Sequence, residues 1–229
     1  PQAVSNLRTF PFKPGGKAAL SPRRYPMKKK IISAMTKKER IQAAIHGDAV
    51  DHVPYSLWTH LPGIDLDPAR NAEHTYDFYK KYDVDILKTM NNGMYSVEDF
   101  GVTTDFSDIA KGGVAKITDT PVKEPEDWLK VKPVSVNAGA LAREQKYLKL
   151  LLNKTKGEVP VVFTVFSPLT TANKLCPSMM EHIREGHGNK VKEGLKAITE
   201  ITCALVQRVI ELGADGIFFA TQLSSCLLY

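Results

Sequence analysis

The chain has 229 residues, of which 43% are hydrophobic and 24% charged, and its 31 basic and 25 acidic residues give a formal charge of +6. This composition is typical of a folded globular protein, and it excludes a collagen, a wholly disordered chain and a membrane bundle. No stretch approaches the roughly 18 consecutive apolar residues that a spanning helix needs. Three cysteines without a C-x-x-C pair favour a reduced, cytoplasmic chain.

The positive charge is concentrated in residues 1–34, which hold eight basic residues and no acid, leaving 23 basic and 25 acidic residues elsewhere. Five prolines and no apolar periodicity predict that this segment is a disordered basic leader. Its apolar run is too short for a signal peptide. Upstream sequence ahead of a start at Met27 or Met35 is favoured over an organelle transit sequence. The basic charge therefore indicates neither a nucleic-acid nor a membrane partner.

The chain after Met35 has regular secondary-structure signals. The capping box from Thr36 to Glu39 predicts a helix that continues to Ile45. Further helices are predicted at about 71–82, 136–153, 177–185 and 190–212, and residues 99–133 form an excursion of turns and short strands. Strands are predicted at 53–58, 84–88, 159–166 and 217–220. The resulting β-α-β-α-β-α-β order requires a parallel sheet, in either a barrel or a doubly wound fold.

Polar and aromatic residues follow the predicted strands, at the end where barrel enzymes carry their chemistry. They are Trp58, Thr59 and His60; Lys88, Thr89 and Asn91; Ser167, Thr170 and Thr171; and Thr221 and Gln222. The sequence contains no phosphate-binding loop, no G-x-S-x-G and no H-E-x-x-H. His182 and His187 lie five residues apart, on different faces of a helix, so no metal site is predicted.

Asp85 lies within a predicted strand, between apolar residues. A carboxylate that points into a barrel often marks a ligand, because its burial is costly unless it is paired. The alternative is that Asp85 ends a loop and is solvated, and the pattern leaves both open. His60 has two interpretations as well, an acid–base group or a surface histidine.

Five segments together resemble the uroporphyrinogen decarboxylase superfamily over about residues 36–222. They are Met35-Thr-Lys-Lys-Glu-Arg-Ile-Gln-Ala-Ala-Ile-His-Gly-Asp48 with Asp51-His-Val-Pro-Tyr55, Tyr82-Asp-Val-Asp-Ile-Leu-Lys88, Phe166-Ser-Pro-Leu-Thr170 and Gly213-Ala-Asp-Gly-Ile-Phe-Phe219. The superfamily includes the haem-pathway decarboxylase and corrinoid-dependent methyltransferases. The resemblance implies an α/β fold of the TIM-type (β/α)8 barrel family. Residues 35–222 would supply about four βα units, an incomplete barrel, and 223–229 an unmatched tail.

The resemblance also implies roles for single residues. Asp85 matches the aspartate that gathers pyrrole N–H groups in the decarboxylase and would be catalytic, stabilising positive charge on the substrate. Its replacement by Asn is expected to abolish turnover in a full-length parent and to leave the fold intact. The expected substrate-binding residues are Trp58, His60, Lys88, Asn91, Ser167, Thr170 and Thr221. The decarboxylase needs no cofactor, whereas the methyltransferase uses zinc and a corrinoid, with zinc ligands beyond this sequence.

One departure from the family pattern bears on the reaction. The decarboxylase has an arginine-containing loop after its first strand, where this chain has residues 58–63 without arginine. A substrate with many carboxylates needs guanidinium groups, so methyl transfer from a corrinoid to a thiol is favoured over tetrapyrrole decarboxylation. The alternative is a non-catalytic remnant or a module that docks a corrinoid protein. Half a barrel exposes sheet edges, so this chain alone is expected to be inactive and poorly soluble, or a homodimer.

Overall fold

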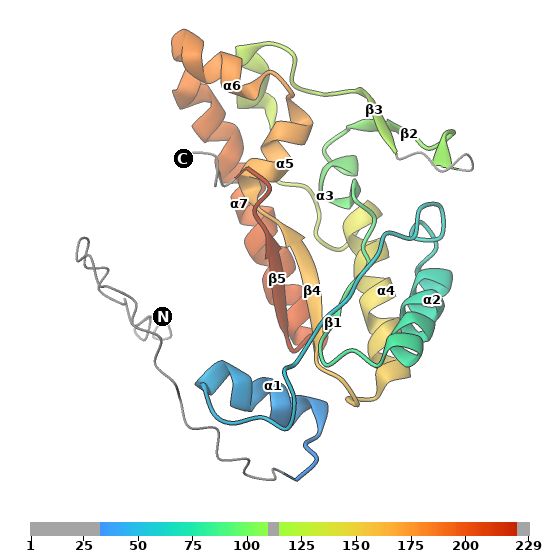
Figure 1. Ribbon diagram of the computed structural model, residues 1–229. Helices are drawn as coiled ribbons and strands as arrows, with labels where there is room; N and C mark the ends of the chain where they lie inside the picture. The colour runs from blue at the N-terminus through green and yellow to red at the C-terminus, as the bar shows by residue number, and fades with distance from the viewer. Residues whose placement is uncertain (1–32, 110–114, 224–229) are drawn as a thin grey trace, which may run out of the picture. The chain divides into compact units, whose positions relative to one another are not determined.

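The structure is a computed structural model, and it describes residues 33–109 and 115–223 (Figure 1). The chain divides into two compact units, Pro1–Ile31 and Ile32–Tyr229. The first unit lies outside the described residues, and so do nearly all of the predicted leader and all but Leu223 of the predicted tail.

The described part of the second unit alternates helices with parallel strands and includes one antiparallel hairpin. Its elements are α1 Lys37–His46, α2 Pro68–Tyr82, β1 Leu87–Lys88, α3 Tyr95–Glu98, β2 Thr103–Asp105, β3 Lys116–Asp119, the 3-10 helix η2 Pro125–Lys130, α4 Gly139–Thr155, β4 Val161–Phe166, α5 Pro168–Leu175, α6 Met179–His182, the π-helical turn η3 Ile183–His187, α7 Gly188–Glu211 and β5 Gly216–Ala220. No helix among these is long and apolar enough to cross a membrane.

The main sheet has the spatial order β1-β4-β5, and both strand pairs are parallel. The prediction of a parallel sheet is therefore confirmed. Lys88 pairs with Val162, and Thr164 with Phe218. Because side chains alternate along a strand, these four residues point to one face of the sheet.

The opposite face of the sheet is the core of the domain. Val161, Phe163 and Val165 are buried there together with residues of α2, α4 and α7. These three helices run alongside the sheet in Figure 1. The residues of β4 that face the helices are all apolar, which explains the nearly continuous hydrophobic run of this strand.

The prediction of a strand at residues 53–58 is wrong. The segment has no strand pairing, although its backbone passes beside β1 (Figure 1) and Asp85 N donates to Tyr55 O at 2.9 Å. The Tyr55 amide donates to the Asp85 carboxylate at 3.0 Å instead of to a main-chain carbonyl. The Asp85 carboxylate therefore takes the place of the main-chain carbonyl that would accept this amide in a strand pair. The described parallel sheet has three strands, where the sequence pattern predicted four.

Local capping signals define the helix starts. Thr36 and Glu39 form the predicted capping box of α1. Helix α5 was not predicted, although it has a similar signal: Ser167 accepts the Thr170 amide, and Pro168 occupies the first helical position. Helix α5 begins two residues after the end of β4. From the sequence pattern alone, its first residues are therefore placed at the polar end of the strand.

The excursion between β1 and α4 contains α3, the antiparallel hairpin of β2 and β3, and η2. It packs on a second apolar cluster, in which Trp128 is completely buried. Gly194 on α7 lies under this indole, and a Cβ atom at Gly194 would lie 2.6 Å from Trp128 Cε3. Glycine here permits the close approach of α7 to η2.

Candidate functional site

Lys88 is the centre of the candidate site on the open face of the sheet. Its Nζ lies 3.9 Å from the ring centroid of Trp58 and 4.8 Å from that of Phe218. The residue is 8% exposed, and no carboxylate among the described residues pairs with its ammonium group. Burial lowers the pKa of Lys88 to about 8. Two aromatic rings thus hold an ammonium group that gives up its proton more easily than an ordinary lysine does.

A second lysine lies near the carboxyl end of β4. The Lys174 Nζ, on α5, donates to Gly93 O at 2.6 Å and lies 4.2 Å from the ring centroid of Phe166. Burial lowers the pKa of Lys174 to about 8 as well. The carboxyl edge of the sheet therefore carries two weakly basic amines next to aromatic rings. The sequence analysis did not select Lys174, because it lies within the helix that was not predicted.

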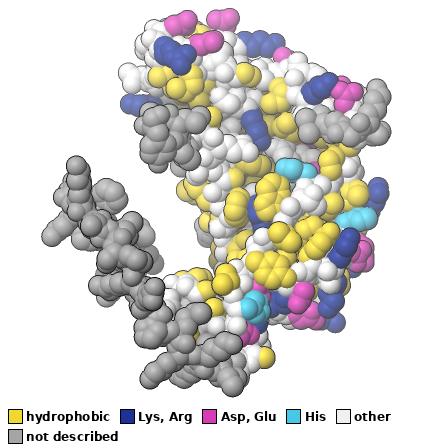
Figure 2. Space-filling model, in the orientation of Figure 1, with side chains coloured by type: hydrophobic (Ala, Val, Ile, Leu, Met, Phe, Trp, Pro, Cys, Tyr) yellow, Lys and Arg dark blue, Asp and Glu magenta, His cyan; other side chains and the backbone are white. Residues whose placement is uncertain are grey.

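Hydrophobic side chains surround Lys88 on the surface. Trp58 and Phe218, the two rings in contact with the Lys88 ammonium, are 48% and 43% exposed. Figure 2 shows hydrophobic side chains gathered on the face of the molecule where the sheet and the segment beside it lie. Among the expected site residues, His60 joins this group because its ring makes an edge contact with Trp58, with centroids 5.0 Å apart. Flat, exposed aromatic surface is suited to a planar ligand.

A buried polar network supports the end of β1. Asn91 accepts a hydrogen bond from Thr89 Oγ1 at 2.5 Å and donates from Nδ2 to Glu144 at 2.8 Å. Burial raises the pKa of Glu144 to about 7, although Arg143 and Asn91 oppose this effect. Arg143 also makes a two-pronged ion pair with Glu98, with N–O distances of 2.7 and 2.9 Å.

The sequence analysis missed Glu144, although a signal was present. Glu144 lies three residues after Leu141 and four before Leu148, on the apolar face of α4. A carboxylate on such a face must have a buried partner.

The remaining expected residues lie at the same edge. Ser167 and Thr170 are buried, and their hydroxyl oxygens are 2.9 Å apart. Ser167 caps α5 by accepting the Thr170 amide, and the two hydroxyls face each other. Thr221 follows β5 directly and is exposed.

Asp85 lies at the other end of β1, away from this edge. One carboxylate oxygen accepts from Arg40 Nη1 at 2.6 Å, and the other accepts the Tyr55 amide and lies 3.3 Å from His52 Nε2. Arg40 also pairs with Asp51 at 2.6 Å. The interpretation of Asp85 as a solvated loop residue is wrong, because its side chain is 1% exposed, and its role as a ligand-binding carboxylate stays a prediction. The carboxylate is buried and joins α1, the 53–58 segment and β1.

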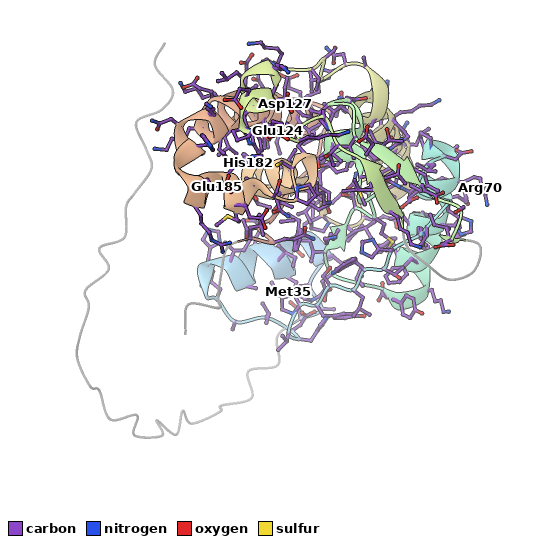
Figure 3. All side chains as sticks on the ribbon, turned by 90° about the horizontal axis from the view of Figure 1, so that it is seen from above. Met35, Arg70, Glu124, Asp127, His182 and Glu185 are labelled. Atoms are coloured by element: carbon purple, nitrogen blue, oxygen red, sulfur yellow. The ribbon has the colours of Figure 1, made fainter. Side chains whose placement is uncertain are left out.

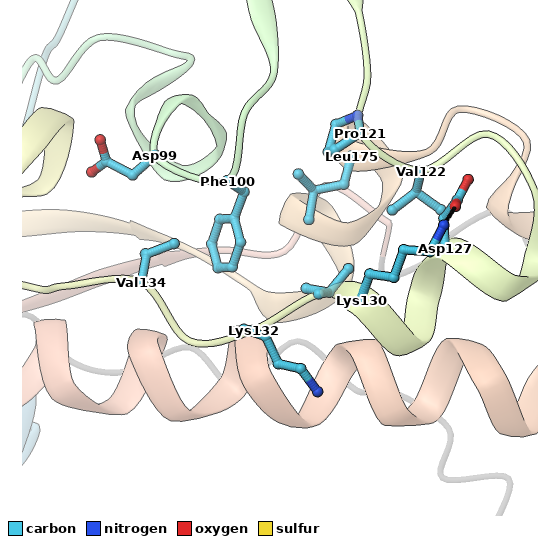
Figure 4. Close-up of a pocket in the computed structure, with 10 residues that line it drawn as sticks. Asp99, Phe100, Pro121, Val122, Asp127, Lys130, Lys132, Val134 and Leu175 are labelled. Carbon is cyan, nitrogen blue, oxygen red and sulfur yellow. Dashed lines mark hydrogen bonds and ion pairs between the residues drawn. The ribbon is translucent and has the colours of Figure 1, made fainter.

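A separate cavity of about 150 Å³ lies between the turn after α3, the η2 region and α5 (Figure 4). Its two carboxylates already have partners. Asp99 accepts the amides of Ala140 and Leu141 at the start of α4, and Asp127 accepts two amides and the Lys130 ammonium. This cavity is therefore a packing feature of the second cluster.

Among the described residues, no group of three or more His, Cys, Asp or Glu side chains is arranged so that it could hold a metal ion. Cys176 is buried with its Sγ 3.8 Å from His182 Nδ1, and Cys203 is exposed. The described residues therefore do not supply a zinc site.

The fold and the site define an α/β protein with an aromatic, lysine-bearing edge on a parallel sheet. Its family follows from comparison: the family described as uroporphyrinogen decarboxylase (URO-D) matches residues 36–228. The chain belongs to this family. No curated protein matches it closely enough to extend the assignment.

One solved structure with a similar fold is a methyltransferase from Methanosarcina mazei, with a TM-score of 0.70 and 21% sequence identity. The match covers 85% of this chain and 61% of that protein. The likeness shows the fold. The chain spans about three fifths of the length of that relative.

Proposed function

We propose that this chain is part of a TIM-type (β/α)8 barrel enzyme that binds a corrinoid and transfers its methyl group to a thiol. The family assignment and the fold shared with a methyltransferase support the barrel. In such barrels, ligands bind at the carboxyl ends of the strands. Lys88, Trp58 and Asn91 lie at that edge, whereas Asp85 does not.

The observation that carries the proposal is the chemistry of this edge: aromatic rings, amides and hydroxyls are present, but arginine is absent from it among the described residues. Arg40 is paired with Asp51 and Asp85 at the other end of β1. Arg143 belongs to the buried network behind the end of β1, where Glu98 and Glu144 pair with it. Arg70 is exposed on α2, at the side of the molecule in Figure 3. A corrin ring carries mainly neutral carboxamides on its rim, whereas the decarboxylase substrate carries many carboxylates that favour guanidinium forks.

The chain's own residues would bind and orient the ligand. Trp58 and Phe218 would contact the macrocycle, and the polar residues at the strand ends, with His60, would contact its rim. The corrinoid would supply the methyl group, and zinc, held by ligands outside this chain, would activate the thiol. A corrinoid protein or a second copy of the chain would dock on the same exposed aromatic surface.

Tetrapyrrole decarboxylation is the second candidate, and the two lysines favour it. Lys88 and Lys174 could each hold one carboxylate as a point charge, although without the bidentate geometry of arginine. In that case no cofactor is needed. The third possibility, a module without catalytic activity, would bind a corrinoid protein and leave the small molecules unbound.

Binding measurements on this chain distinguish the candidates. Hydroxocobalamin and uroporphyrin are titrated separately while tryptophan fluorescence is followed. We expect cobalamin to bind at least tenfold more tightly, and Trp58→Ala to weaken it by about tenfold, or roughly 1.4 kcal/mol. Tyr82→Ala, an exposed aromatic residue on α2, is the matched control and should bind normally. Tighter uroporphyrin binding that is lost in Lys88→Met would support decarboxylation, and binding of neither ligand would contradict both.

A further inference from the structure

A pocket of about 250 Å³ lies beside the end of β1 and is distinct from the open face of the sheet. Three parts of the chain line it: the turn that follows the 53–58 segment, the chain between β1 and α3, and residues between β2 and β3. Its walls include His60, Asp65, Asn92, Met94, Phe106 and Ile109. At about 30 Å³ per water molecule, its size corresponds to a ligand of roughly eight non-hydrogen atoms. Apolar side chains form most of the wall, so the polar groups within it define the ligand.

Asp65 is the decisive polar group of this pocket. The residue is 6% exposed, and its Oδ1 has no hydrogen-bond partner in the described structure. The backbone holds it firmly, because its amide donates to Leu61 O at 2.9 Å within a tight turn. A buried acceptor without a partner costs free energy, which a ligand that donates a hydrogen bond would recover.

The charged groups around Asp65 determine whether the ligand should be a cation or an anion. Burial raises the pKa of the Asp65 carboxyl, while Asn92, Arg143 and His60 act in the opposite direction. Arg143 is the nearby permanent cation, but its guanidinium is already engaged by Glu98 and Glu144. The Arg143 guanidinium thus lies near three carboxyl groups and pairs with two of them, Glu98 and Glu144. Asp65 has no ion pair among the described residues.

We propose that this pocket binds a small organic ammonium ion, whose N–H group donates to Asp65 and whose apolar part contacts Phe106, Met94 and Ile109. A positive charge balances the excess of carboxylates, and the ring of Phe106 adds a favourable surface for a cation. A metal ion fits less well, because hard cations need six or more oxygen ligands and this wall is mainly apolar. His60 borders both this pocket and the aromatic surface beside Lys88. The inference does not rest on the proposed function, because Asp65 and Phe106 define the ammonium ligand and neither takes part in the proposed corrinoid site.

The test is calorimetric titration of the full chain with benzylammonium, which has eight non-hydrogen atoms. Benzyl alcohol has the same shape without the charge, and benzoate carries the opposite charge. We expect benzylammonium to bind at least tenfold more tightly than either. Asp65→Asn keeps the shape of the side chain and should weaken benzylammonium binding at least tenfold.

The matched control is Asp77→Asn, the same substitution at an exposed position of α2. It should leave binding unchanged. A thermal melt shows whether each variant is folded, and Asp65→Asn should melt at or above the wild-type temperature because it removes a buried charge. Equal binding of the alcohol and the ammonium ion, or binding that survives in Asp65→Asn, would overturn the proposal. Phe106→Leu is a second, milder variant, and it should reduce affinity if the ring contacts the cation.

Discussion

The Arg40 guanidinium and the Asp85 carboxylate form a buried ion pair of 2.6 Å between α1 and the start of β1. The same guanidinium holds Asp51 and donates to Met35 O, so that one side chain ties together four parts of the chain. Asp51 is affected in turn, since its hydrogen bonds with Arg40 lower the pKa of its carboxyl well below the usual range. This geometry gives Asp85 a structural role.

Asp85→Asn should therefore destabilise the fold, which changes the earlier expectation that the fold would stay intact. The loss should be about 1.5–3 kcal/mol, because a buried hydrogen bond between charged groups is lost while Arg40 keeps its pair with Asp51. Urea unfolding followed by circular dichroism measures it. Asp83→Asn is the control. Asp83 forms an ion pair too, with Lys37, but its side chain is 83% exposed. This substitution should therefore lower the free energy of unfolding by less than about 1 kcal/mol. Equal midpoints for the two variants would contradict the structural role.

Lys88 should react with amine reagents at a lower pH than other lysines. Its pKa is lowered to about 8, so half of its amines are neutral near that pH. Competitive acetylation from pH 6 to 11, read by peptide mass spectrometry, gives the midpoint for each lysine. Trp58→Ala and Phe218→Ala should raise the midpoint of Lys88 by admitting water. A midpoint above 10 in the wild type would refute the buried environment.

Glu144 should make the protein less stable as the pH rises. The pKa of this group is about 7 in the folded state and 4.5 ordinarily, so the folded state binds the proton more tightly. The stabilisation is complete below about pH 4.5 and is lost as the pH rises to about 7. Since one pKa unit is ~1.4 kcal/mol, the largest change is about 3 kcal/mol.

Chemical unfolding at a series of pH values measures this change. Glu144→Gln should flatten the curve between pH 4.5 and 7, although its overall stability also reflects the altered bonds to Arg143 and Asn91. Glu193→Gln, on the exposed face of α7, should leave the shape of the curve as it is in the wild type. A slope that persists in Glu144→Gln would assign the effect to another group, with Asp65 the nearest candidate.

Gly194→Ala should separate α7 from η2. The added methyl group would lie 2.6 Å from Trp128 Cε3 and 3.2 Å from Trp128 O, and one of the two elements must move. Overpacking of this kind costs about 1–3 kcal/mol. Thermal unfolding measures the cost, and near-ultraviolet circular dichroism reports the environment of Trp128. Gly188→Ala, with no atom within 4 Å of the new carbon, should be neutral or slightly stabilising.

Helix positions were predictable from sequence because their signals are local. The capping box at Thr36 lies within four residues, and the apolar spacing that predicted α7 repeats within its own 24 residues. The parallel direction of β1, β4 and β5 was predictable for a related reason, since a helix between two strands leaves little choice of direction. The same logic placed Lys88 and Asn91 at one edge of the sheet.

Long-range partners account for what the sequence pattern did not reveal. Asp85 and Arg40 are 45 residues apart, and no periodicity links a carboxylate to a guanidinium at that distance. Residues 53–58 have the composition of a strand, but a strand exists only where a neighbouring backbone supplies the hydrogen bonds, and here the Asp85 side chain takes one of them. Whether a buried polar group is paired depends on which other groups the fold brings within hydrogen-bond distance of it. Sequence pattern thus determined where most of the longer helices form and which way the strands run. Tertiary packing decided that Asp85 joins three parts of the chain, while Asp65 Oδ1 has no hydrogen-bond partner in the described structure.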